Sequence, residues 1–379
     1  MTALPTWMAD VTVFVIALAV SVAATPLVRG FAVRWRLGDK PNGRKAHAEH
    51  IPHLGGVALF LAVAVAVLAA GVLARRGAGD WSLLAKAVPV VMTVVLLGLV
   101  DDMRNLRARQ KLVVQTVAAA VLVAVGFRFF TGVWLLDVSS ILLVVLSMVF
   151  IVGMLSSVNL IDGHDGLAAG VALISAVAFA VIGGMIGAPD VVTLSLAVCG
   201  ACLGFLFFNF PPGRIYMGDT GSMMLGLLLA LMACMVSMRS HSANTFAAVC
   251  LVLGLPILDT MLAIARRLVL RSPVFAADTL HMHHVLRASG LSPRRTLVVL
   301  YGMQALSCLL GVAAAANWVA PVIVGLGFLT VAFVAFLRAM VEIPAERATA
   351  AARPAASSAI PFQSSFPTGL QERRTSVGR

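Results

Sequence analysis

Residues 141–187 read ILLVVLSMVFIVGMLSSVNLIDGHDGLAAGVALISAVAFAVIGGMIG, two apolar runs joined by a short polar segment. A helix needs about 20 apolar residues to cross about 30 Å of hydrocarbon, and each run is close to that length. The polar segment carries Asn159, Asp162, His164 and Asp165. The pattern predicts two membrane-spanning helices joined by a polar turn at a membrane surface.

The whole chain repeats this pattern. Of its 379 residues, 60% are hydrophobic and only 12% are charged, which is typical of a polytopic membrane protein. We predict an all-α fold in which residues 1–341 form a transmembrane domain and residues 342–379, rich in Ala, Ser and Pro, form a disordered tail. Eleven spans are predicted, at residues 10–30, 54–73, 83–100, 112–129, 139–157, 167–187, 191–210, 222–238, 245–265, 297–315 and 320–338.

Basic residues predict the orientation of these spans. Most Lys and Arg fall in the loops on one side and in the tail, and loops of this kind stay in the cytoplasm. The N-terminus is therefore expected outside and the C-terminus inside. The net charge of +12 then follows from topology and contact with the lipid bilayer, and it needs no nucleic acid partner.

Acidic residues and histidines gather on the same side. Asp and Glu contribute little to orientation, so topology alone does not explain their placement. The sequence therefore predicts an active site at the cytoplasmic face. A transporter would instead need polar groups at the midplane of several spans, and the middle of nearly every span here is apolar.

The first polar segment, GDKPNGRKAHAEHIPHLGG at 38–56, combines Lys40, Arg44 and His47 with turn-forming residues. Lys and Arg side chains and free backbone N–H groups suit a phosphate. The alternative is a basic cytoplasmic loop with incidental histidines, and the segment alone does not separate the two.

The second segment places Asp101 and Asp102 at the end of a span. Neighbouring residues on a helix point about 100° apart, so one carboxylate is expected to face the site while the other orients Lys111, Arg104 or a metal-bound water. The alternative is a solvated helix end, although acids there oppose the helix dipole.

The third and fourth segments carry candidate metal ligands. Asn159, Asp162 and Asp165 recur every three residues, and Asp219 lies in the turn GDTGS at 218–222. Hard oxygen donors of this kind suit Mg²⁺. A solvated turn is the alternative for the three acidic or amide groups, but no Lys or Arg in that loop neutralises them.

The fifth segment begins with Asp259 inside a predicted span. Arg266, two helical turns along the same face, is its expected partner, as a structural ion pair or beside the substrate. Further on, HMHH supplies His281, His283 and His284, which suit a diphosphate better than zinc because no Cys lies nearby.

Together these segments resemble the polyprenyl-phosphate N-acetylhexosamine-1-phosphate transferases of glycosyltransferase family 4. The resemblance rests on DKPNGRKAH, VDD, NLIDGHDGLAAG, YMGDTGS and HMHH, and it favours the bacterial N-acetylglucosamine branch over the phospho-N-acetylmuramoyl-pentapeptide branch. It implies transfer of a sugar-1-phosphate from a UDP-N-acetylhexosamine to undecaprenyl phosphate, with Mg²⁺ as cofactor and UMP as product. A homodimer is possible for such a protein.

The resemblance also implies roles for particular residues. Metal binding falls to Asn159 and Asp219, and catalysis or phosphate organisation to Asp101, Asp102, Asp162 and Asp165. Substrate binding falls to Lys40, Asn42, Arg44, His47, Lys111, Arg266, Arg267, His281, His283 and His284. One departure is AADTL before the histidines, where the family usually carries a PDR element.

Overall fold

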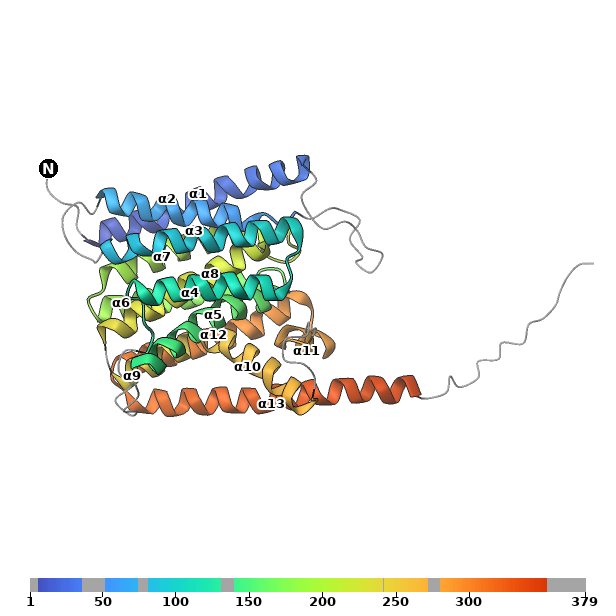
Figure 1. Ribbon diagram of the computed structural model, residues 1–379. Coiled ribbons are helices and arrows are strands. Elements are labelled where there is room, and N and C mark those ends of the chain that lie inside the picture. Colours follow the sequence, from blue (N-terminus) through green and yellow to red (C-terminus); the bar gives the residue numbers. More distant parts are fainter. Residues whose placement is uncertain are drawn as a thin grey trace, which may run out of the picture. The chain divides into compact units, whose positions relative to one another are not determined.

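The fold is known from a computed structural model that describes residues 6–35, 52–73, 81–130, 140–240, 242–271 and 280–352. The chain divides after Met340 into two units, residues 1–340 and 341–379. Within the described residues all regular structure is helical, as Figure 1 shows. The predicted all-α, polytopic fold class is therefore confirmed.

The thirteen helices of the described residues follow one another as α1 (Thr6–Arg34), α2 (Gly55–Leu73), α3 (Trp81–Arg104), α4 (Ala108–Ala124), α5 (Ser140–Ile161), α6 (Leu167–Met185), α7 (Pro189–Asn209), α8 (Gly218–Arg239), α9 (Ala243–Val252), α10 (Gly254–Val269), α11 (Met282–Ala288), α12 (Pro293–Ala315) and α13 (Val319–Ala352). The last of them continues beyond residue 342, where the tail was expected to begin.

Nine of these helices are long and apolar enough to span a membrane, counting only the described residues. Two predicted spans differ from the structure. The run at 245–265 is not one straight helix, because α9 and α10 meet at an angle of 76°. The run at 112–129 corresponds to α4, which has 17 residues and ends at Ala124, since the chain turns at Val125 and at Gly126 with its positive φ of 116°.

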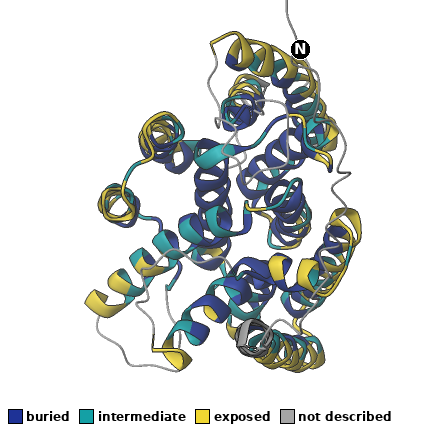
Figure 2. Ribbon diagram, turned by 90° about the vertical axis from the view of Figure 1, so that its right-hand side faces the viewer, coloured by how far each residue is buried: buried dark blue, intermediate teal, exposed yellow. Residues whose placement is uncertain are grey.

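Helix α8 lies at the centre of the first unit, where it contacts α2, α3, α5, α6, α7 and α9. Figure 2 shows buried ribbons in the middle of the bundle and exposed ones around it. In the most apolar window of α8, 94% of the residues are buried, compared with 11% in that of α13. Helix α8 is thus shielded by protein, and α13 offers an apolar surface suited to lipid.

Glycines allow neighbouring helices to approach the start of α8 closely. A Cβ on Gly98 of α3 would lie 2.6 Å from the backbone N of Thr220, and one on Gly56 of α2 would clash with the backbone of Gly221. These contacts fix the N-terminus of α8 against the C-terminus of α3.

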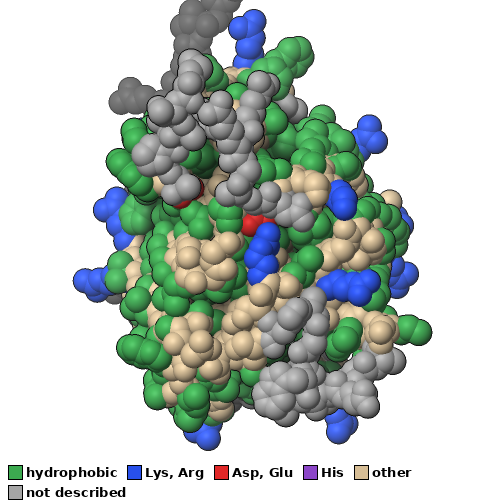
Figure 3. Space-filling view, turned by 90° about the vertical axis from the view of Figure 1, so that its left-hand side faces the viewer, with side chains coloured by type: hydrophobic (Ala, Val, Ile, Leu, Met, Phe, Trp, Pro, Cys, Tyr) green, Lys and Arg blue, Asp and Glu red, His purple; other side chains and the backbone are tan. Residues whose placement is uncertain are grey.

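The two ends of the first unit differ in chemistry. One end collects the C-termini of α3 and α5, the N-termini of α4 and α8, and helices α10 and α11, at the right of Figure 1. At the other end Asp190 of α7 pairs with Arg239 of α8 at 2.5 Å. Figure 3 shows this second end, where apolar side chains surround scattered Lys and Arg and little acidic surface.

Candidate active site

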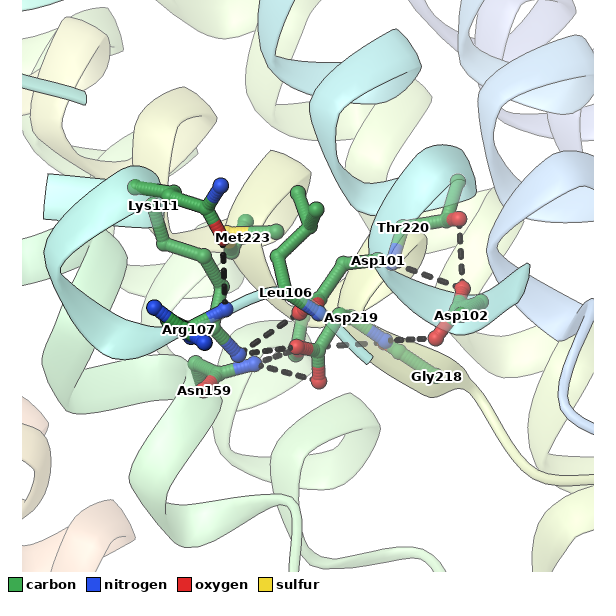
Figure 4. Close-up of polar contacts among 12 residues, drawn as sticks. Asp101, Asp102, Leu106, Arg107, Lys111, Asn159, Gly218, Asp219, Thr220 and Met223 are labelled. Carbon is green, nitrogen blue, oxygen red and sulfur yellow. Dashed lines mark hydrogen bonds and ion pairs between the residues drawn. The ribbon is translucent and has the colours of Figure 1, made fainter. Parts of the chain in front are cut away.

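Lys111 joins the ends of three helices. Its Nζ lies 2.6 Å from Oδ2 of Asp101 at the end of α3 and 2.7 Å from Oδ2 of Asp219 at the start of α8. The backbone N–H of Leu106 donates to Oδ1 of Asp101 at 2.7 Å, which closes the short turn between α3 and α4. Figure 4 shows these side chains pointing toward one another.

This arrangement keeps the side chain of Lys111 positively charged. Burial alone would lower the pKa of Lys111, but the hydrogen bonds and negative charges of Asp101 and Asp219 outweigh it and raise that pKa above its usual value. The ammonium group has three donors, and the two carboxylates use two of them. Among the described residues, the third N–H of Lys111 has no acceptor.

Asn159, in the last turn of α5, holds Asp219 from the other side. Its Nδ2 donates to Oδ1 of Asp219 and to Oγ of Ser222, both at 2.9 Å, and Ser222 donates in turn to the carbonyl of Gly218 at 3.0 Å. Its own Oδ1 accepts no hydrogen bond from any described residue. Asn159 therefore offers a neutral oxygen beside a carboxylate.

Asp102 faces a different target from Asp101, as expected for helix neighbours. Its Oδ1 accepts the backbone N–H of Asp219 at 2.7 Å, and its Oδ2 accepts the N–H and the hydroxyl of Thr220 at 3.1 and 2.6 Å. A carboxylate at a helix N-terminus satisfies free N–H groups and favours the helix dipole. Gly218 permits this approach, because its φ is 73° and a Cβ there would lie 2.7 Å from Asp102.

Asp162 has a carboxylate to which no described residue donates a hydrogen bond. Burial, followed by the negative charges of Asp219, Asp102 and Asp165, raises its pKa well above the usual value for an aspartate. The cluster thus holds four aspartates, Asp101, Asp102, Asp162 and Asp219, and the single ammonium group of Lys111.

This excess of carboxyl groups suits a divalent cation. Among the described residues, no three His, Cys, Asp or Glu side chains form a group that could hold a metal by themselves. Magnesium is usually bound through one or two carboxylates together with substrate phosphates and waters. The carboxylate of Asp219, the Oδ1 of Asn159 and the neighbouring carboxylate of Asp162 fit that kind of site.

The side chain of Asp165 connects the loop after α5 to the loop before α8. Its Oδ2 accepts the backbone N–H of Gly213 at 2.9 Å. The adjacent Gly166, with a φ of 77°, donates its N–H to Asn209 at 2.8 Å and accepts the hydroxyl of Tyr301 at 2.5 Å. Asn209 also donates to the carbonyl of Ile215 at 2.8 Å. The loop 162–166 is thus fixed to the loop 211–217.

The sequence reasoning did not identify Asn209, Tyr301, Thr220 or Ser222. Thr220 and Ser222 lie inside the quoted GDTGS motif, and Asn209 lies in the neighbouring FNFPPGR, so proximity to the motif could have suggested them. Nothing in the local sequence around Tyr301 indicates its contact with Gly166, 135 residues earlier.

Asp259 of α10 is bonded to the histidine segment. Its Oδ2 lies 2.7 Å from Nδ1 of His281, and its Oδ1 accepts the backbone N–H of Met282 at 2.8 Å. The predicted pairing with Arg266 was therefore wrong: the start of α11 returns to α10 and supplies both partners. Arg266 and Arg267 lie about two turns further along α10.

The histidines form one cluster with the loop after α5. The ring of His283 lies 4.0 Å from that of His284 and 6.0 Å from those of His281 and His164, measured between centroids. A Cβ on Gly163 would lie 3.0 Å from Nε2 of His283. Burial and the neighbouring histidines lower the pKa of His283 to about 2, so this ring is neutral.

The structure therefore brings together Asp101, Asp102, Lys111, Asn159, Asp162 and Asp219. It places Asp165 in the loop after α5, Asp259 in α10, and His281, His283 and His284 at the start of α11. Lys40, Asn42, Arg44 and His47 lie outside the described residues.

Comparison with known proteins points in one direction. Residues 81–237 match the family model for glycosyl transferase family 4. A protein of Bacillus subtilis (strain 168), named probable undecaprenyl-phosphate N-acetylglucosaminyl 1-phosphate transferase, is 35% identical over 296 residues, which cover 77% of this chain and 81% of that protein.

Two further relatives extend the comparison. The decaprenyl-phosphate N-acetylglucosaminephosphotransferase of Mycolicibacterium smegmatis is 33% identical over 308 residues, covering 73% of this chain and 75% of the relative. The phospho-N-acetylmuramoyl-pentapeptide-transferase of Shouchella clausii is 29% identical over 323 residues, covering 79% of this chain and 95% of the relative.

Proposed function

This chain belongs to glycosyl transferase family 4 and is a polyprenyl-phosphate sugar-phosphate transferase of the membrane, and we propose that it moves N-acetylglucosamine-1-phosphate from UDP-N-acetylglucosamine to undecaprenyl phosphate. UMP leaves, and the lipid-linked sugar starts a glycan. The observation that carries this proposal is Lys111 held between Asp101 and Asp219, with Asn159 and Asp162 beside them.

The proposed step is a phosphoryl transfer in which an oxygen of the lipid phosphate attacks the phosphorus that bears the sugar. One P–O bond forms, the P–O bond to UMP breaks, and UMP keeps the electron pair. Such reactions depend on positioning and on stabilisation of charge. A lipid phosphate has a second pKa of about 6, so it is largely a dianion at neutral pH and needs little help from a base.

Mg²⁺ would supply positive charge for the diphosphate of the donor. Asn159 and Asp219 are the residues proposed to hold it, and Asp162 lies close enough to raise the local negative potential. Lys111 donates to a phosphate oxygen with its remaining N–H, while Asp102 keeps the backbone of Asp219 in place. Asp101 keeps Lys111 oriented.

The histidine cluster is proposed to bind the phosphates of the nucleotide-sugar. Asp259 accepts from Nδ1 of His281, which fixes the orientation of that ring. His283 is neutral and therefore contributes a hydrogen bond and no positive charge. Arg266 and Arg267 add positive charge from the end of α10. Lys40, Asn42, Arg44 and His47 are proposed to complete the phosphate contacts.

The proposed site faces the cytoplasm of a bacterial cell, with the N-terminus outside, because basic residues such as Arg104, Arg107 and Arg109, from the end of α3 to the start of α4, lie on the side of the site. A homodimer in the membrane is compatible with this arrangement and remains part of the proposal.

A purified preparation in detergent tests the reaction. With Mg²⁺ and undecaprenyl phosphate, UDP-N-acetylglucosamine is expected to release UMP and to yield a lipid product, and omission of either the metal or the lipid abolishes both. UDP-N-acetylgalactosamine and UDP-N-acetylmuramoyl-pentapeptide are the competing donors. Turnover only with the latter would assign the chain to the reaction named for the Shouchella clausii relative.

The same assay distinguishes the mechanism. Direct attack by the lipid predicts that no sugar-phosphate label stays on the protein when the lipid is omitted. A labelled aspartate under those conditions would show a covalent intermediate. If no UDP-sugar is turned over, the proposal fails, and a transport assay becomes the next measurement.

A further inference from the structure

The bent span formed by α9 and α10 has an internal break. Helix α9 ends at Val252, α10 begins at Gly254, and the two axes differ by 76°. A break leaves C=O groups at the end of one helix and N–H groups at the start of the next without helical partners. In hydrocarbon there is no water to satisfy them, so other protein groups must do so.

Gln304 of α12 satisfies both sides of this break. Its Nε2 donates to the carbonyl of Val252 at 2.7 Å, and its Oε1 accepts the N–H of Leu255 at 3.2 Å. One carboxamide thus connects the last residue of α9 to the second residue of α10. Gln304 is 0% exposed, and Pro256, the next residue of α10, has no N–H that would need a partner.

Two serines extend the same network. Ser175 of α6 donates to the carbonyl of Val252 at 3.0 Å and accepts the second N–H of Gln304 at 2.8 Å. Ser307, one turn along α12, donates to the carbonyl of Leu251 at 2.6 Å. All three polar side chains are buried and all act on the break.

The direction of α10 decides where part of the active site lies. Asp259, which holds His281 and Met282, follows Leu255 by one helical turn. Thr260 donates to Ser157 of α5 at 2.7 Å, and α5 carries Asn159 half a turn later. The orientation of α10 therefore sets the distance between the histidine cluster and the residues around Asp219.

We propose that Gln304 is a positioning residue of the transferase, which fixes the bend between α9 and α10 and thereby places Asp259 and His281 for the nucleotide-sugar. The kinetic part of this inference rests on the proposed function. The geometric part does not, because it concerns only the direction of α10.

A disulfide measures the geometry directly. Cysteines in place of Ser157 and Thr260 would have their sulfur atoms close together, since the two hydroxyls now lie 2.7 Å apart. Copper-phenanthroline is expected to join this pair rapidly in the detergent-solubilised full chain. Adding Gln304→Met, which keeps the length of the side chain and removes its hydrogen bonds, is expected to slow the joining at least about fivefold. A protein with Ser157→Cys alone controls for the native cysteines.

Kinetics then separate positioning from general loss of structure. Gln304→Met is expected to raise the KM for UDP-N-acetylglucosamine about tenfold and to leave the KM for undecaprenyl phosphate within about twofold. A buried glutamate at position 304 is expected to be protonated, so Gln304→Glu keeps one donor and one acceptor. Its KM for UDP-N-acetylglucosamine is therefore expected to lie closer to that of the parent protein than to that of Gln304→Met. Ser21→Ala is the matched control, because it removes a buried hydrogen bond to the carbonyl of Ala201 between α1 and α7.

If Gln304→Met does not fold, Ser307→Ala removes a single contact at the same break and should give the same effects at smaller size. The proposal is overturned if the variant shows an unchanged cross-linking rate or an unchanged KM for UDP-N-acetylglucosamine. It is also overturned if only kcat falls, in proportion to the fraction of folded protein. If the parent protein turns over no UDP-sugar, the proposed function fails and the cross-linking rate still decides the geometry.

Discussion

The carboxylate of Asp102 accepts the backbone N–H of Asp219 at 2.7 Å, so one acidic residue fixes the main chain of another. The neighbouring carboxylate of Asp101 points instead to Lys111 at 2.6 Å. The two consecutive acids therefore act on different parts of the same site, and their substitutions are expected to differ.

Asp102→Asn is expected to lower both stability and turnover. The amide NH2 would face the N–H groups of Asp219 and Thr220, and the negative charge at the start of α8 would be lost. Loss of an N-terminal cap costs about 1–2 kcal/mol, and the Tm in detergent should fall accordingly. Asp101→Asn keeps the acceptor for Leu106 and is expected to reduce turnover with a smaller change in Tm. Equal shifts in Tm for both variants would contradict this division.

Asn159→Ala is expected to raise the Mg²⁺ concentration needed for half-maximal turnover about tenfold. The variant removes a neutral oxygen beside Asp219 and the hydrogen bonds that orient that carboxylate. Titration of Mg²⁺ at saturating UDP-sugar measures the effect. Ser222→Ala is the control, because it keeps Asn159 and its bond to Asp219. An unchanged metal requirement in Asn159→Ala would remove this residue from the proposed metal site.

Asp259→Asn and His281→Ala are expected to have non-additive effects on kcat/KM for the donor. The two side chains form a buried pair with Asp259 1% exposed and His281 4% exposed, so removal of either one leaves the other misplaced. The double variant should have about the same kcat/KM as the less active of the two single variants. Additive losses in a double-mutant cycle would show that the two residues act independently.

His283 is expected to make the protein less stable as the pH falls below about 6.5, the ordinary pKa of an unfolded histidine. In the folded state burial holds its pKa at about 2, so only the unfolded chain takes up the proton in this range. Stability then declines by at most about 1.4 kcal/mol per pH unit. Thermal unfolding of His283→Gln, which cannot titrate, should show a smaller decline between about pH 6.5 and pH 5. Identical slopes would contradict the neutral, buried state of His283.

Much of the fold could be predicted because hydrocarbon imposes a simple rule on the sequence. Apolar runs of suitable length formed helices such as α3 and α5, and the acidic and amide residues at their ends, Asp101, Asn159 and Asp162, proved to lie near Asp219. The sequence could group these residues on one side of the membrane, but it could not assign Lys111 to both Asp101 and Asp219.

The failures have physical causes. The run at 245–265 is apolar on both sides of Leu253, and the break there is stabilised by Gln304, about fifty residues later, so local hydropathy carries no sign of it. The expected Asp259–Arg266 pair followed from helical spacing, whereas the true partner arrives on another helix. Tyr301 and Asn209 act through single hydrogen bonds to Gly166, which no periodic pattern reveals.

The central position of α8 also bears on how the protein is made. Helices α2, α3, α5, α6 and α7 precede it along the chain, so the ribosome delivers α8 into a space that most of its neighbours already surround. The Asp101–Lys111 contact, contained in the adjacent helices α3 and α4, can form before that moment, whereas every contact of Asp219 must follow it. The contacts of the proposed site therefore cannot all form until residue 219 has been synthesised, and a nascent chain released before residue 218 would lack every contact of Asp219.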